Sequence, residues 1–111
     1  MAARNPLLNA PPYEVDAALK TLGANLRIAR LHRGLTVDEI GQRIGAGRRA
    51  VADAERGKPT TAIAVYVALL WALGLIDHLA DVAAPGKDAE GLARSLTRTR
   101  ARRKEAIDND F

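Results

Sequence analysis

The chain has 111 residues, of which 48% are hydrophobic and 4% aromatic, so it can form one domain with a core of leucine, isoleucine, valine and alanine. It contains no cysteine, which excludes disulfides, cysteine-ligated zinc and thiol nucleophiles. Lysine and arginine number 17 against 13 acidic residues, and the net charge of +4 is compatible with a polyanionic partner.

Other protein classes are disfavoured as well. No stretch approaches the roughly 20 apolar residues of a membrane span and no signal peptide is evident, so we expect a cytoplasmic protein. His32 and His78 lie far apart without a metal-ligand pattern, so we expect neither metal nor cofactor. The neighbouring carboxylates Asp38 and Glu39 do not face each other on a helix, and no acid, base and nucleophile converge, so no enzyme is predicted.

The first part of the chain predicts an arm followed by a helix. Residues 1–12 contain Pro6, Pro11 and Pro12 and little periodicity, which indicates an irregular arm. Apolar residues then recur at helical spacing, which predicts a helix that starts between Pro12 and Asp16 and runs to about His32. Gly34 interrupts the pattern after that helix.

Residues 35–57 predict two short helices joined by a glycine turn. Thr36 can cap the first helix, and Glu39 three residues later completes a capping box. Gly45 can take the positive φ that ends this helix, and Gly47 can stand at the next N-cap. The second helix is predicted to stop at Gly57.

The outer face of the second short helix carries the functional signal. Its apolar side comprises Ala50, Val51 and Ala54. The exposed start and the opposite side comprise Arg48, Arg49, Ala52, Asp53 and Arg56. Two helices crossing steeply at such a turn form a helix-turn-helix, whose second helix lies in the DNA major groove. The alternative is a helical hairpin with solvated arginines that binds nothing.

Two further helices are predicted before residue 84. One starts near Thr60 or Thr61, ends at Gly74 and is apolar on more than one side, so it is either central or covered by a partner. We expect Trp71 to lie in the core. A short fifth helix from Leu75 to Ala83 should leave an apolar side uncovered, and we expect a homodimer interface there, formed by Leu75, Ile76, Leu79 and Val82.

The end of the chain differs in composition. Residues 85–111 are basic and poor in large apolar residues, which predicts one marginal helix from Asp88 followed by a mobile tail. Its arginines can follow phosphates, whereas Ile107 and Phe111 can anchor in a protein groove; a tail that only aids solubility is the alternative. The predicted divisions are an arm over 1–12, a domain over 13–84 and this tail over 85–111.

Residues 20–83 resemble the Xre/Cro-repressor family of helix-turn-helix regulators. The resemblance rests on Leu35-Thr36, Glu39, Ile40, Arg43-Ile44-Gly45, Val51 and Glu55-Arg56-Gly57. It implies an all-α, five-helix, lambda-repressor-like helix-turn-helix domain with a flexible basic C-terminal tail. It also implies that Arg30 and Glu55 form a buried ion pair between the first and third helices.

The same resemblance implies a set of DNA-binding positions. They are Thr36, Arg43, Gly47, Arg48, Arg49, Ala52, Asp53, Arg56 and Lys58. The chain departs from the family at three contact positions, where Val37, Gly47 and Ala50 replace polar residues, and Asp53 adds a charge that phosphate repels.

The function expected from these features is a sequence-specific transcriptional repressor that binds a near-palindromic double-stranded DNA operator as a homodimer. The small size and arginine-rich end resemble the antitoxins of HipBA-type modules, which repress their operon and bind a HipA-like kinase toxin. Two alternatives remain: a generic dimeric regulator of the Xre family, and a protein-interaction module that has lost DNA binding.

Overall fold

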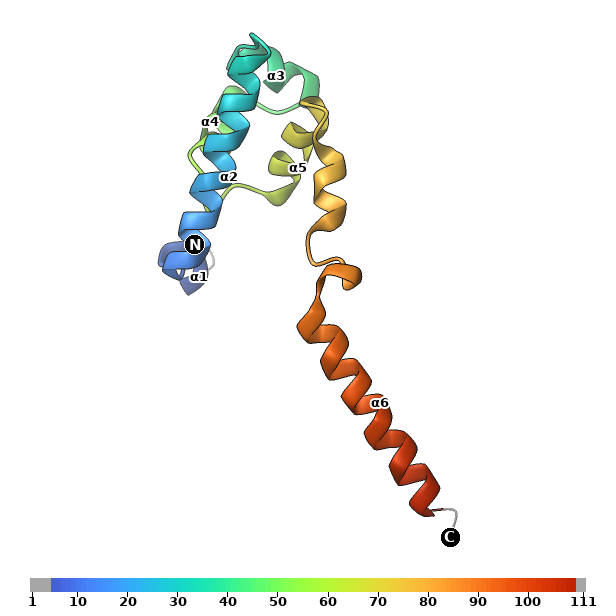
Figure 1. Cartoon of the computed structure of the whole chain (residues 1–111). Helices are drawn as coiled ribbons and strands as arrows, with labels where there is room; N and C mark the ends of the chain where they lie inside the picture. The colour runs from blue at the N-terminus through green and yellow to red at the C-terminus, as the bar shows by residue number, and fades with distance from the viewer. Residues whose placement is uncertain (1–4, 110–111) are drawn as a thin grey trace. The chain divides into compact units, whose positions relative to one another are not determined.

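The computed structural model describes residues 5–109, and within this range the chain is helical without strands, which confirms the all-α prediction (Figure 1). The chain divides into two compact units, one up to Ile76 and one from Asp77. The α-helices are α1 (Pro6–Asn9), α2 (Tyr13–His32), α3 (Val37–Ile44), α4 (Arg48–Glu55), α5 (Ile63–Ala72) and α6 (Ala89–Asn109), and two short 3₁₀ helices are η1 (Ile76–Asp81) and η2 (Pro85–Lys87).

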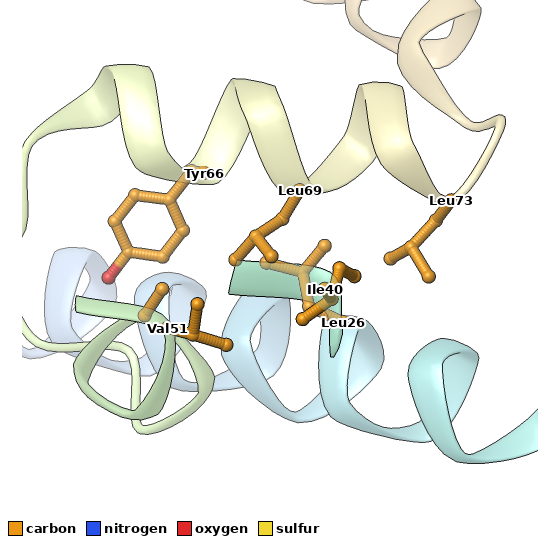
Figure 2. Packing of buried hydrophobic residues seen from close by; sticks show 7 residues of the cluster. Leu26, Ile40, Val51, Tyr66, Leu69 and Leu73 are labelled. Atoms are coloured by element: carbon orange, nitrogen blue, oxygen red, sulfur yellow. The ribbon is translucent and has the colours of Figure 1, made fainter. Parts of the chain in front are cut away.

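The core of the first unit lies between α2, α3, α4 and α5. Tyr66 and Leu69 of α5, and Leu73 directly after it, follow one another at steps of three and four, and Figure 2 shows them pointing toward the other helices. The facing side chains are Leu26 of α2, Ile40 of α3, and Val51 and Ala54 of α4. Leucine, isoleucine, valine and alanine thus supply most of this core, as the composition predicts.

Helix α2 approaches the end of α4 so closely that no side chain fits between them. A β-carbon on Gly23 would lie 2.5 Å from the carbonyl oxygen of Ala54 and 2.6 Å from the amide nitrogen of Gly57. Gly57 itself has a φ of 68° and packs against the backbone of Leu19, so it must also be glycine. At Gly23 and Gly57 the contact between α2 and the end of α4 is therefore backbone against backbone.

The predicted arm is not irregular throughout. Residues 6–9 form the one-turn helix α1, because Asn5 accepts a hydrogen bond from the amide of Leu7 at 3.0 Å and Pro6 occupies the first helical position. The expectation of an irregular segment over 1–12 is wrong for these four residues, and residues 1–4 lie outside the described range.

The prediction that Trp71 belongs to the core is wrong. Its side chain is 58% exposed. The buried face of α5 is set by Tyr66, Leu69 and Leu73, and residue 71 lies on the other side of the helix. Helix α5 also begins at Ile63, two to three residues after the predicted start.

The predicted fifth helix is a 3₁₀ helix, η1, and Ala83 beyond it has a φ of 58°, which ends regular helical structure there. None of the helices in the described part of the chain is both long and apolar enough to span a membrane.

The helix predicted to begin near Asp88 is present and extends well into the segment expected to be a tail, whereas residues 110–111, including Phe111, lie outside the described range. Helix α6 continues without a break from Ala89 to Asn109 (Figure 1). Asp88 accepts a hydrogen bond from the amide of Gly91 at 3.0 Å, and Arg94 pairs with Glu90 at 2.6 Å. After Gly91 the segment contains no glycine or proline and is rich in alanine, arginine and leucine, which are strong helix formers.

Candidate nucleic-acid interface

The start of α3 carries the predicted capping box. The Thr36 hydroxyl accepts a hydrogen bond from the amide of Glu39 at 3.1 Å, and the amide of Thr36 donates to Oε1 of Glu39 at 3.1 Å. The backbone amide of Thr36, and after it the Thr36 hydroxyl, lower the pKa of the Glu39 carboxyl below its ordinary value. Thr36 is exposed, so its remaining surface is open to a ligand.

The turn between α3 and α4 is as tight as the sequence predicts. Gly45 has a φ of 71° and ends α3, and Gly47 occupies the N-cap of α4 with extended backbone angles. Gly41 is buried, and a β-carbon there would lie 2.9 Å from the carbonyl oxygen of Ala46. Gly41 was not predicted to matter, although a glycine inside a helix pattern can signal a close backbone approach.

Helix α4 has one face in the core and one in solvent. Val51 and Ala54 are fully buried, which fixes the rotation of the helix. Arg48 and Arg49 at its start are exposed, as is Gly47 before them. The sequence-predicted positions Ala50, Ala52 and Asp53 are half-buried at the edge of this face.

Three of the cations at the predicted DNA-binding positions lie near acidic side chains. Nη1 of Arg48 lies 3.5 Å from Oδ2 of Asp38 on α3. Asp53 lies 3.9 Å from both Nη1 of Arg56 and Nζ of Lys58. The exposed guanidinium of Arg49 makes no salt bridge with any side chain that the structure describes, and the same holds for Arg43 of α3.

The loop after α4 is held in place by a tyrosine. The hydroxyl of Tyr66 donates to the carbonyl oxygen of Lys58 at 2.9 Å, and the amide of Lys58 donates to the carbonyl oxygen of Asp53 at 3.1 Å. Burial raises the pKa of the Tyr66 hydroxyl. The side chain of Lys58 therefore extends from a backbone fixed at two points, and Tyr66 is a supporting residue that sequence reasoning missed.

The end of α4 and the segment before α3 are both held by Arg30, which pairs with Glu55. Nε and Nη2 of Arg30 donate to the two carboxylate oxygens of Glu55 at 2.7 and 2.9 Å. Nη1 of Arg30 donates to the carbonyl oxygen of Leu35 at 2.8 Å. The bond to Glu55 raises the pKa of Arg30, so the guanidinium is firmly charged. One side chain of α2 thus holds both the end of α4 and the segment before α3.

Comparisons with known proteins agree with this geometry. Residues 21–84 match the model of a family described as helix-turn-helix domain. The chain is 38% identical over 66 residues to a Sinorhizobium fredii protein named "Uncharacterized HTH-type transcriptional regulator y4mF", over 60% of this chain and 83% of that relative. No solved structure matches.

Proposed function

The chain belongs to the helix-turn-helix domain family, and from this premise we propose that it is a DNA-binding transcription regulator. The observation that carries the proposal is the orientation of α4. Val51 and Ala54 of α4 are buried in the core, so Arg48 and Arg49 face solvent. They lie at the N-terminal end of the helix, which in helix-turn-helix proteins contacts base edges in the major groove.

Arg49 is proposed to read base edges. It is exposed and has no acidic partner among the described side chains, so its guanidinium is available for a bidentate bond to guanine. Arg48 has a weaker claim, because Asp38 competes for its charge at 3.5 Å.

The other polar positions are proposed to contact or border the DNA backbone. Arg43, Arg56 and Lys58 supply positive charge for phosphates. Thr36, Gly47 and Ala52 allow close approach, and Asp53 offsets part of the charge of Arg56 and Lys58.

We further propose that the protein acts as a homodimer, because two linked half-site contacts bind DNA far more tightly than one. The exposed side of α5 offers an apolar surface: Ile63 is 76% exposed, Val67 is half-buried and Trp71 is 58% exposed, at successive intervals of four. Helix α5 has no charged residue, so two copies can meet there without burying charge. Ile76, Leu79 and Val82 of the sequence-predicted interface are also exposed and remain a second candidate surface, whereas Leu75 packs against the core.

As a dimer on a near-palindromic operator, the protein is proposed to repress transcription by covering the site that polymerase needs. A role as the antitoxin of a HipBA-type module, binding a HipA-like kinase, is the finer proposal. It draws its support from the exposed, arginine-rich helix α6. Co-purification with the product of the adjacent gene tests this role separately from DNA binding.

The test of DNA binding uses the duplex upstream of the protein's own reading frame and a scrambled duplex of equal length. We expect tighter binding to the first duplex, measured by fluorescence anisotropy. Arg49→Ala should reduce this preference by about 1–3 kcal/mol, and Arg27→Ala, an exposed arginine of α2, serves as the matched control. Binding to neither duplex contradicts the proposal.

A further inference from the structure

Helix α6 carries a concentration of positive charge outside the helix-turn-helix. Between residues 94 and 104 it has six cations and no acidic residue: Arg94, Arg98, Arg100, Arg102, Arg103 and Lys104. Every side chain from Leu92 to Ile107 is exposed. Arg94 pairs with Glu90, but Arg98, Arg100 and Arg102 make no salt bridge with any side chain in the described part of the chain.

These charges surround the helix instead of occupying one face. With about 3.6 residues per turn, Arg94, Arg98 and Arg102 follow one another along one side. Arg100 and Lys104 lie on a second side. Like charges four residues apart repel each other in a helix, so this arrangement favours a partner of opposite charge.

The distribution of apolar side chains disfavours two other kinds of partner. Leu92 and Leu96 are confined to the first turns of α6, and residues 97–105 contain no large apolar side chain. A helix that lies on a membrane needs an apolar face along its length. A coiled coil needs an apolar seam of a and d positions that continues along the helix. A polyanion satisfies the charges of this segment without either feature.

We propose that α6 is a second DNA-contacting element, whose residues 94–104 bind phosphates of the duplex beside the operator sequence that α4 reads. This inference rests on the proposed DNA-binding function. The rise of about 1.5 Å per residue spreads these cations over about 15 Å, a length of duplex that carries several phosphates. Because phosphates carry no sequence information, α6 adds affinity and salt dependence, whereas α4 supplies the sequence preference.

The test replaces Arg98, Arg100 and Arg102 together by glutamine, which keeps the helix-forming tendency and removes three charges. Binding of the full-length protein to the upstream duplex and to the scrambled duplex is measured over a series of salt concentrations. We expect the slope of log affinity against log salt to become shallower on both duplexes, by about 2–3 for each protomer whose α6 contacts DNA and so by about 5 for the proposed dimer. The matched control replaces the same three residues by lysine, and this variant should keep the slope of the original protein.

The possible outcomes separate the two proposals. If the original protein binds neither duplex, DNA binding itself fails. If it binds the upstream duplex and the glutamine variant shows an unchanged slope, α6 does not contact DNA and only the present inference is overturned. Binding to vesicles of phosphatidylserine and phosphatidylcholine is measured in parallel. If the glutamine variant loses binding to these vesicles while its salt slope on DNA is unchanged, the partner of α6 is a membrane and the inference is overturned. The lysine variant keeps all three charges. If its slope of log affinity against log salt becomes as shallow as that of the glutamine variant, the contact does not depend on charge and the inference is overturned.

Discussion

Arg30 and Glu55 form a buried, two-pronged ion pair that ties α2 to the end of α4, with both side chains only 8% exposed. Removing one partner leaves a buried charge without compensation, which typically costs about 3–5 kcal/mol. We expect Glu55→Ala to lower the free energy of unfolding in urea by this amount, and DNA binding to be lost through unfolding.

Two further variants sharpen that measurement. Arg30→Met combined with Glu55→Leu removes both charges and should recover much of the lost stability. Glu105→Ala, on the exposed surface of α6, should change stability by no more than about 0.5 kcal/mol. A Glu55→Ala protein as stable as the Glu105→Ala control would mean that the pair contributes nothing.

Gly23→Ala should destabilise the protein even though alanine favours helices by up to about 1 kcal/mol over glycine. The added methyl group would meet the backbone of Ala54 and Gly57, which cannot move aside as a flexible side chain can. We expect a net loss of about 1–3 kcal/mol in urea unfolding. Gly86→Ala, which has no atom within 4 Å of the added carbon, is the control and should be close to neutral. Equal stability of the two variants would refute the close contact.

The capping box of α3 predicts a pH dependence. The folded-state pKa of Glu39 lies below its ordinary value of 4.5, because the amide and hydroxyl of Thr36 stabilise the carboxylate. This stabilisation is therefore present above that ordinary value and is lost as pH falls through the lowered pKa. Glu39→Gln keeps a side chain that can complete the box but does not titrate. Thermal unfolding should show a smaller loss of stability in acid for Glu39→Gln, and parallel pH profiles would exclude this contribution.

Asp53→Asn should tighten DNA binding. The Asp53 carboxylate lies 3.9 Å from Arg56 and from Lys58, so it offsets two cations proposed to meet phosphate. Such partly exposed pairs contribute little to stability, about 0–1 kcal/mol, so the fold should tolerate the change. The gain should be equal on the upstream and scrambled duplexes. Weaker binding, in contrast, would mean that Asp53 positions the two cations.

Trp71→Ala should convert the proposed dimer into a monomer. The side chain is more than half exposed and lies beside Val67 on the uncharged face of α5, where a second copy would cover it. Tyr13→Ala removes another exposed aromatic side chain, from the start of α2, and should leave the dimer intact. Light scattering coupled to size-exclusion chromatography distinguishes these results. If the Trp71→Ala protein stays dimeric, the α5 surface is not the interface, and Ile76, Leu79 and Val82 become the candidate surface.

The sequence predicted those parts of the fold that depend on local chemistry. Thr36 with Glu39, and Gly45 with Gly47, define helix ends through caps and backbone angles, and the structure has all four in those roles. Features that depend on packing were missed. Trp71 could not be assigned to a face because α5 is apolar all round, and only the positions of Tyr66 and Leu69 against the other helices decide which side is buried.

The predicted site residues divide in the same way. The positions at the start of α4 follow from its periodicity, because Val51 and Ala54 mark the buried side. The salt bridges between Asp38 and Arg48 and between Asp53 and Lys58 join residues whose distance depends on the turn or the loop between them. No periodicity within one helix contains that information.

The close contact of Gly23 with the end of α4 also bears on how such a protein can change over generations. Since this contact joins one main chain to another, no rotamer at the junction can adjust when a neighbouring core residue changes size. Substitutions at the exposed Arg48 or Arg49 alter the outer surface of α4 and do not involve the atoms of that junction. Binding preference can therefore diversify through surface substitutions while the orientation of the helix that presents them is inherited unchanged.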